Sequence, residues 1–216
     1  MRYANYLIMR RLICTLWIFI AVSYSIAQNT QYIYNSKYKV TLPNKLELQA
    51  SELNNVKQLG GAQVAIKTLS GHITFQQKGL NSNTKEAFSK YVRVIIEYFE
   101  EDRLDPTYGI GDKVVVDKDV LYAVNEAAEA NCKASKTPLI KIMSVEPLTI
   151  NGFPTLYFSY KRKGWEGQPP VIVNVYRIFN RYESVTLTFS YREAERGQWG
   201  SINENIIKYF TFTKKY

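Results

Sequence analysis

Cysteine and histidine are scarce in this chain, and their scarcity excludes several kinds of site. The 216 residues include two cysteines and one histidine, His72. One cysteine, Cys14, lies in a segment that we expect to be removed, which leaves Cys132 alone. A single cysteine cannot form an intramolecular disulfide, so the core must stabilise the fold. Cys/His zinc sites usually take three or four protein ligands. We therefore expect no metal and no cofactor.

The first 27 residues have the three parts of a secretory signal peptide. Arg2, Arg10 and Arg11 form a charged start, the apolar run 12–22 follows, and Ser25-Ile26-Ala27 supplies the small residues of a cleavage site. The run is shorter than the roughly 20 apolar residues that span a bilayer. Cleavage is therefore favoured over the alternative, retention as a signal anchor. We expect an exported protein, periplasmic or secreted, with no transmembrane segment after cleavage.

The charge is moderately basic. The signal segment carries three arginines and no acidic residue, so its removal lowers the formal net charge from +9 to +6. Such a charge favours an anionic partner, either another protein or an anionic component of the cell envelope. Nucleic acid is not expected as a partner outside the cytoplasm.

The remaining length fits one domain, which we place at residues 38–216 after a flexible lead-in at 28–37. Alternating apolar residues predict two short strands and then a hairpin that turns at Ser70-Gly71. These strands are expected at residues 38–42, 46–49, 63–69 and 72–78.

A helix is predicted over residues 83–103, because Asn83 and Glu86 have capping-box spacing and apolar residues recur at helical intervals. Those apolar residues are Phe88, Tyr91, Val92, Ile95, Ile96 and Phe99. Asp119 is expected to cap a second helix that runs to about Ser135. One face of that helix carries Leu121, Val124, Ala128 and Cys132.

Four strands joined by short connections are predicted next, and such strands must be antiparallel. Asn151-Gly152 is a strong turn signal between the first two. Ser201 and Glu204 then have the spacing to open a final helix, which carries Ile202, Ile206 and Phe210 on one face. The strands are expected at residues 140–145, 155–163, 171–180 and 183–192. Strands in blocks with three helices outside them indicate an α+β domain.

Residues 151–212 resemble the PsbP/Mog superfamily, which includes DcrB-like bacterial envelope proteins. The resemblance lies in NGFPTLYFSYKRKG, VIVNVYRIF, SVTLTFSYRE and INENIIKYFTF. The closing segment Tyr209-Phe210-Thr211-Phe212 has tyrosine where the family usually has serine. The resemblance implies an antiparallel sheet flanked by helices, as an α/β/α sandwich. It implies no common activity, because members of one fold can differ in function. Most members are binding or assembly proteins, which makes an enzyme less expected.

The candidate partner-binding surface surrounds the loop 164–170, where an exposed tryptophan among cations would suit protein binding. The alternative is a tryptophan folded back onto the edge of the core, with a solvated basic rim around it. It comprises Lys161, Arg162, Lys163 and Trp165, with Arg177 and Arg181 expected to add charge nearby. We favour a non-enzymatic binding or accessory protein of the cell envelope. The alternatives are an envelope hydrolase and a small-molecule or lipid carrier with an unrecognised pocket.

Two residues could also carry chemistry, and each has a structural alternative. Cys132 is either a reactive thiol beside Lys133 or a small buried hydrophobe on its helix. His72 is either a catalytic group or an ordinary polar residue beside a turn. The acidic residues Glu97, Glu100, Glu101 and Asp102 are interpreted as the solvated face of the helix at 83–103. No catalytic residue is assigned.

Overall fold

The computed structural model describes residues 29–34, 36–50, 56–59, 63–66, 72–82, 90–104 and 107–216. The predicted signal peptide, the Ser70-Gly71 turn and the Asn83/Glu86 capping box lie outside these residues. The strands are β1 (Asn29–Tyr34), β2 (Tyr38–Pro43), β3 (Leu46–Leu48), β4 (Val56–Leu59), β5 (Gln63–Ile66), β6 (His72–Gln77), β7 (Val92–Glu100), β8 (Leu139–Ile150), β9 (Phe153–Arg162), β10 (Val171–Phe179), β11 (Glu183–Arg192) and β12 (Thr211–Phe212). The α-helices are α3 (Lys118–Ala134) and α4 (Arg196–Lys208).

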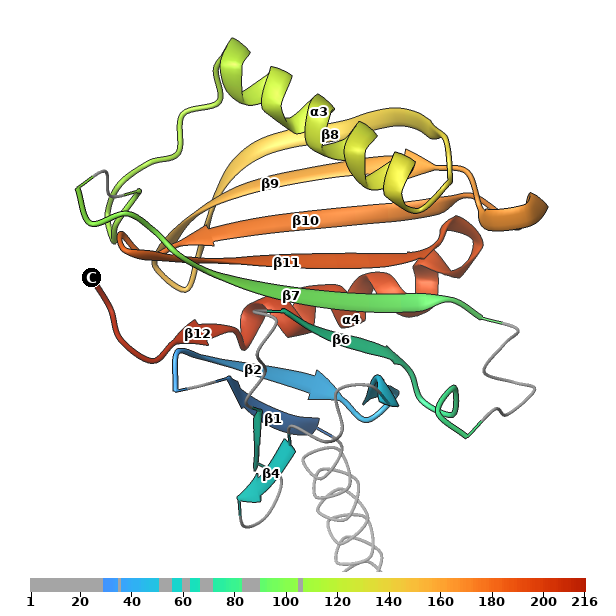
Figure 1. Cartoon of the computed structure of the whole chain (residues 1–216), viewed down its shortest axis with the longest axis horizontal. Coiled ribbons are helices and arrows are strands. Elements are labelled where there is room, and N and C mark those ends of the chain that lie inside the picture. The colour runs from blue at the N-terminus through green and yellow to red at the C-terminus, as the bar shows by residue number, and fades with distance from the viewer. Residues whose placement is uncertain are drawn as a thin grey trace, which may run out of the picture.

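The larger sheet has seven antiparallel strands in the order β3-β6-β7-β11-β10-β9-β8 (Figure 1). Its second half is the predicted meander. Asn151 and Gly152 have φ values of +51° and +89°, the left-handed conformation that a two-residue hairpin turn requires. The four predicted strands are confirmed, although β8 is longer than its apolar run.

The smaller sheet has the order β12-β2-β1-β5-β4 and changes two predictions. Residues 29–34 form a strand rather than a flexible lead-in, because β1 pairs with β2 on one edge and with β5 on the other. The expected hairpin between β5 and β6 is also wrong, since the two strands belong to different sheets. Local alternation identified the strands but could not identify their partners.

The helix predicted over residues 83–103 is wrong in its described part. Residues 92–100 form β7, which lies between β6 and β11. Val92, Val94 and Ile96 are at most 2% exposed, whereas Arg93 is exposed, which is the two-residue period of a strand. The run of valine and isoleucine favours a strand, and two neighbouring strands satisfy its backbone hydrogen bonds.

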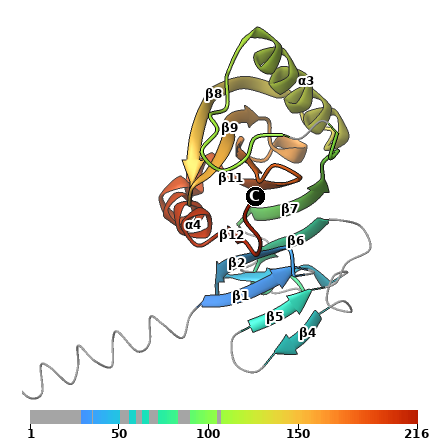
Figure 2. The ribbon, with the colours of Figure 1, turned by 90° about the vertical axis from the view of Figure 1, so that its left-hand side faces the viewer.

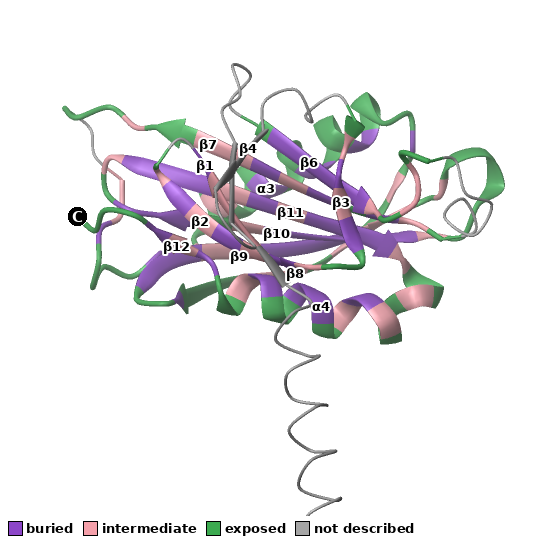
Figure 3. Ribbon diagram, turned by 90° about the horizontal axis from the view of Figure 1, so that it is seen from below, coloured by how far each residue is buried: buried purple, intermediate pink, exposed green. Residues whose placement is uncertain are grey.

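The two faces of the large sheet are covered differently. On one face α4 and the smaller sheet enclose the main core, which includes Trp199, Tyr38 and Phe210, each at most 1% exposed. On the other face α3 packs over β8 and β9, as Figure 2 shows edge-on, with Val124 and Ala128 buried beneath it. Buried residues therefore concentrate on the sheet strands and on the inner sides of the helices (Figure 3). The fold is α+β, but a second sheet shares with α4 the face that helices alone were expected to cover.

Both helices begin at residues other than those predicted. The side chain of Asp117, not Asp119, caps α3 by accepting from the backbone N–H of Val120 at 2.9 Å. Leu121 is 41% exposed, so the buried stripe of α3 begins at Val124. The helix α4 begins at Arg196, which places Ser201 inside it rather than at its cap. The predicted buried face of α4 is confirmed.

Candidate functional site

The six predicted partner-binding residues lie at two opposite ends of the large sheet. Arg162, the last residue of β9, pairs with Val171, the first residue of β10, so Lys161, Lys163 and Trp165 lie at that end. Arg177 is six residues further along β10, which at about 3.3 Å per residue separates it from Val171 by about 20 Å. Arg181 lies beyond Arg177, in the turn that follows β10. The structure therefore does not bring Arg177 and Arg181 to the loop 164–170.

Arg177 and Arg181 are held by their own neighbours. The Nη2 atom of Arg177 lies 3.2 Å from Glu101 Oε1, and its guanidinium lies over the rings of Phe99 and Phe179. The backbone of Arg181 donates to Tyr108 O at 2.8 Å in a tight turn. These contacts give both arginines a place in the fold that requires no partner protein.

We define the basic end as Lys133, Lys136, Lys163 and Trp165, where α3 ends and β9 turns into β10 (right-hand side of Figure 1). Lys163 N donates to Pro138 O at 2.9 Å, which ties the loop to the connection between α3 and β8. The three lysines are exposed, and none forms an ion pair among the described residues. By contrast, Lys161 Nζ lies 2.6 Å from Glu193 Oε2.

Trp165 is held outward by a short, tight turn. It is 61% exposed and begins a 3₁₀ turn in which Glu166 and Gly167 have φ values of +46° and +77°. Gln168 N donates to Trp165 O at 3.0 Å. A side chain at Gly164 would meet Gln168 O at 2.1 Å, so only glycine fits there. A fixed turn presents the indole with little conformational entropy left to lose on binding.

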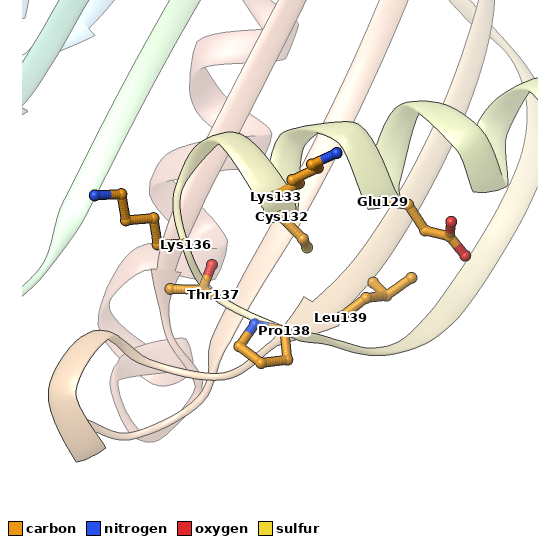
Figure 4. Close-up of a pocket in the computed structure, with 7 residues that line it drawn as sticks. All are labelled: Glu129, Cys132, Lys133, Lys136, Thr137, Pro138 and Leu139. Atoms are coloured by element: carbon orange, nitrogen blue, oxygen red, sulfur yellow. The ribbon is translucent and has the colours of Figure 1, made fainter.

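A hollow of about 410 Å³ lies beside the basic end, within the size range of ligand pockets. The Cys132 side chain points from α3 toward its floor (Figure 4). The hollow is lined by Glu129, Cys132, Lys133, Lys136, Thr137, Pro138 and Leu139. Cys132, Pro138 and Leu139 give the hollow an apolar floor, while Lys133, Lys136 and the carboxylate of Glu129 surround it, so a bound segment would place an apolar side chain there.

Arg162 points inward to a hydrogen-bonded network rather than outward to a partner. Its Nη1 donates to Thr137 Oγ1 at 3.1 Å and its Nη2 to Tyr91 Oη at 3.2 Å. Tyr91 Oη in turn lies 3.2 Å from Ser190 Oγ. This network borders a polar cavity of about 210 Å³. Arg162 therefore positions the end of α3 relative to the sheet.

Cys132 is a buried member of the α3 core. It is 3% exposed, and burial raises the pKa of its thiol above the ordinary value despite the opposing charge of Arg162. Burial likewise raises the pKa of the neighbouring Tyr160 to about 12. A protonated, enclosed thiol is a poor nucleophile, so the structure favours the interpretation of Cys132 as a small hydrophobe.

His72 lies on an open part of the sheet. Cross-strand pairing sets His72 opposite Glu97, and Glu97 opposite Thr186. In a nucleophilic triad the imidazole lies between the hydroxyl and the carboxylate, whereas here the carboxylate occupies the middle position. The order of these three residues across the strands is therefore not that of a nucleophilic triad.

The acidic run at residues 97–102 belongs to β7 and its exit, not to a helix. Glu100 pairs with Lys37 at 3.1 Å, and Glu101 pairs with Arg177. Within the described ranges, no three His, Cys, Asp or Glu side chains are grouped as a metal site would need. Over the same ranges, no helix has the length and hydrophobicity to cross a membrane.

Lys133 and Lys136 were missed by the sequence reasoning, although a signal was present. Both follow the last apolar residue of the α3 stripe, where cations favourably meet the negative end of a helix. That role explains a lysine near a helix end without predicting a binding surface. Only the tertiary structure, in which Lys163 N donates to Pro138 O after α3, shows that these lysines and Trp165 lie at the same end of the sheet.

The comparisons with known proteins place the fold. No protein-family model and no curated protein sequence matches the chain. The solution structure of cyanobacterial PsbP from Synechocystis sp. PCC 6803 matches with a TM-score of 0.50 and 14% identity, over 86% of this chain and 93% of that one. Two further matches, LpqN of Mycobacterium tuberculosis and a protein of Bacteroides thetaiotaomicron, have TM-scores of 0.48 at 10% and 11% identity. They cover 87% of this chain each, and 91% and 49% of the matched chains.

The chain is thus an α+β protein whose core lies between two sheets and their helices. More particularly, it has the PsbP-like fold that the resemblance of residues 151–212 predicts. At this level of identity the likeness extends to the fold alone, so the function must be argued from the surface.

Proposed function

We propose that this chain is an exported, non-enzymatic accessory protein of the cell envelope that binds an acidic segment of another protein at its basic end. The observation that carries the proposal is Trp165, exposed on a tight turn at the end of the sheet where three exposed lysines form no ion pair with any described residue. Tryptophan anchors are enriched where proteins bind one another. The signal-like first 27 residues support export.

The chemistry of the surface supports this class of partner. Lys133, Lys136 and Lys163 would attract carboxylates, and the hollow beside them would accept an apolar side chain. Trp165 would then cover the bound segment from the side of the loop. Arg162 Nη1 contacts the backbone carbonyl of Lys163 at 3.4 Å, but no lysine side chain takes part in the Arg162 network, so the three lysine side chains can be shortened without removing that support.

The first test uses a peptide of glutamates with one central leucine. After removal of the leader the chain has two tryptophans, and Trp199 is 1% exposed, so quenching of fluorescence by acrylamide reports on Trp165. We expect the peptide to protect Trp165 from acrylamide. We expect K133A/K136A/K163A to lose this protection, because the cationic rim is gone.

The matched control is K113A/K118A/K141A, which removes three exposed lysines from other parts of the surface. It should bind the peptide as the unaltered protein does. Equal loss in both variants would show that net charge alone attracts the peptide and would refute a site at the basic end.

The second test places the surface in its expected setting. Cross-linking in envelope extracts should recover a partner with the unaltered chain and lose it with Trp165→Ala. Tyr122→Ala removes a similarly exposed aromatic ring, 66% exposed on α3, and should leave recovery unchanged. Recovery of the same proteins by Trp165→Ala would eliminate the tryptophan as an anchor.

A further inference from the structure

A second cationic cluster lies at the same end of the large sheet but on different strands. Lys45 precedes β3, Lys78 follows β6 and Lys90 precedes β7, and these three strands are neighbours in the order β3-β6-β7. Lys78 N donates to Lys45 O at 2.9 Å, which fixes two of the lysines side by side. We call these three residues the lysine triad.

The lysine triad lines a pocket of about 600 Å³ between the sheet and the start of α4. Asn44, Gln77, Gln198 and Trp199 complete its lining, and none of the described residues that line it is acidic. Glu47, the nearest carboxylate in the sequence to Lys45, instead accepts from Asn81 N at 2.7 Å. The described lining of the pocket therefore carries three positive charges and no carboxylate.

The three lysines are exposed around one pocket, so their charges add and favour an anion there. Like charges near one another repel, and a bound anion would offset that repulsion. Lysine ammonium groups bind phosphate as point charges. Three of them around one pocket match the several oxygens of a phosphate group better than a single carboxylate.

A buried amide supplies a second, independent observation. Gln77 is one of the residues that line the pocket, and its Oε1 atom, which is buried, has no hydrogen-bond partner among the described residues. A buried acceptor requires a donor. A hydroxyl of a phosphate ester or of monohydrogen phosphate would supply it while the remaining oxygens meet the lysines.

We propose that the lysine triad forms a binding site for a phosphate monoester, with the phosphate between Lys78 and Lys90 and a ligand hydroxyl donating to Gln77 Oε1. The volume leaves room for the organic part of the ester as well as the phosphate. The site shares no residue with the basic end, so the two proposals stand or fall separately.

The experiment measures binding of inorganic phosphate and of glycerol phosphate by titration calorimetry, on protein expressed from the complete sequence. We expect glycerol phosphate to bind more tightly than phosphate. K78Q/K90Q should weaken binding at least about tenfold, because two of three charge-assisted contacts are lost. K133Q/K136Q, with the same charge change at the basic end, should bind within about twofold of the unaltered protein.

The unfolding temperature gives an independent measure of ligand binding and also shows whether each variant is folded. Without ligand, K78Q/K90Q should unfold at the same or a higher temperature, because it relieves repulsion among the lysines. Glycerol phosphate should raise the unfolding temperature of the unaltered protein and of K133Q/K136Q, but not that of K78Q/K90Q. No binding by the unaltered protein, or equal weakening by both double variants, would overturn the proposal.

Vesicles of equal parts phosphatidylcholine and phosphatidylglycerol distinguish a lipid headgroup from a soluble ester as the source of the phosphate. Sedimentation with these vesicles that K78Q/K90Q abolishes assigns the site to a lipid headgroup. Binding of glycerol phosphate without sedimentation assigns it to a soluble ester. Sedimentation that K78Q/K90Q leaves unchanged, without binding of glycerol phosphate, counts against the site.

Discussion

The two ends of the large sheet differ in how many of their charged side chains form ion pairs. At one end, which we call the paired end, Lys37 meets Glu100 at 3.1 Å, Arg177 meets Glu101 at 3.2 Å, and Tyr98 Oη donates to Glu183 at 3.0 Å. At the other end Lys161 pairs with Glu193 and Arg192 with Glu195, but the basic end and the lysine triad still leave six described lysines without an ion pair. Charges that neutralise one another contribute to the fold, whereas charges that do not remain available for a ligand.

The difference extends to the proton affinity of the groups involved. A hydrogen bond with Tyr98 and another with Glu100 raise the pKa of Lys37 above its ordinary value, against the effect of burial. Burial raises the pKa of Tyr98 to about 12, with the bond to Glu183 acting in the same direction and Lys37 opposing. The paired end is therefore a coupled polar network, and its removal should affect stability before it affects binding.

The largest effect should follow Asn180→Ala at the paired end. Asn180 is fully buried, its Nδ2 donates to Lys214 O at 2.9 Å, and its Oδ1 accepts from Tyr216 N at 3.0 Å. Loss of both bonds should lower the free energy of unfolding by about 2–3 kcal/mol. Urea unfolding measures this change. Trp165→Ala at the basic end should change it by less than about 0.5 kcal/mol, and similar losses in both variants would break the comparison.

A smaller effect should follow Glu101→Ala. Its carboxylate accepts from Arg177 and from the fully buried hydroxyl of Ser184, so its removal leaves a buried donor without a partner. We expect a loss of about 1–2 kcal/mol in the free energy of unfolding. Glu100→Ala removes only an exposed ion pair and should cost at most about 1 kcal/mol. A larger cost for Glu100→Ala than for Glu101→Ala would contradict this ranking.

The smallest effect at neutral pH should follow Tyr98→Phe, which loses the hydrogen bond to Glu183, worth about 0.5–1 kcal/mol, and the partly exposed one from Lys37, which contributes little. The variant should differ more from the unaltered protein in stability at alkaline pH. Because the folded-state pKa of Tyr98 lies above the ordinary value of 10.0, its contribution to stability is complete below about pH 10 and is lost as the pH rises through about 12. The free energy of unfolding, measured in urea, should therefore decrease less steeply with pH across this range for Tyr98→Phe than for the unaltered protein. Tyr209→Phe, at an exposed position, should leave the slope unchanged and serves as the control.

The second half of the fold could be predicted because its signals are local. The Asn151-Gly152 turn needs only its own residues to adopt positive φ, and the spacing of Val124, Ala128 and Cys132 on α3 is set by helix geometry. In the first half the same kind of reasoning failed at residues 92–100. The spacing of Val92, Ile95, Ile96 and Phe99 fits a helix, whereas Val94 alternates with Val92 and Ile96 as in a strand, and the neighbouring strands decided between the two.

The candidate site was predicted in part for the same reason. Lys163 and Trp165 lie next to each other in the sequence, so their shared surface was visible. Arg177 was assigned to that surface although its strand carries it to the far end of the sheet, where Glu101 pairs with it. The lysine triad could not be predicted from the sequence, because Lys45 and Lys90 come close only when β3 and β7 pair with the two edges of β6.

The amino-acid sequence by itself determined the elements whose hydrogen bonds and buried faces are internal to a short segment. These are the turns, the stripe of α3 and the alternation of the meander strands. Tertiary structure decided which strands pair, which cations meet a carboxylate and which do not. Those outcomes depend on contacts between residues far apart in the chain, and such contacts have no periodicity that a single sequence can show.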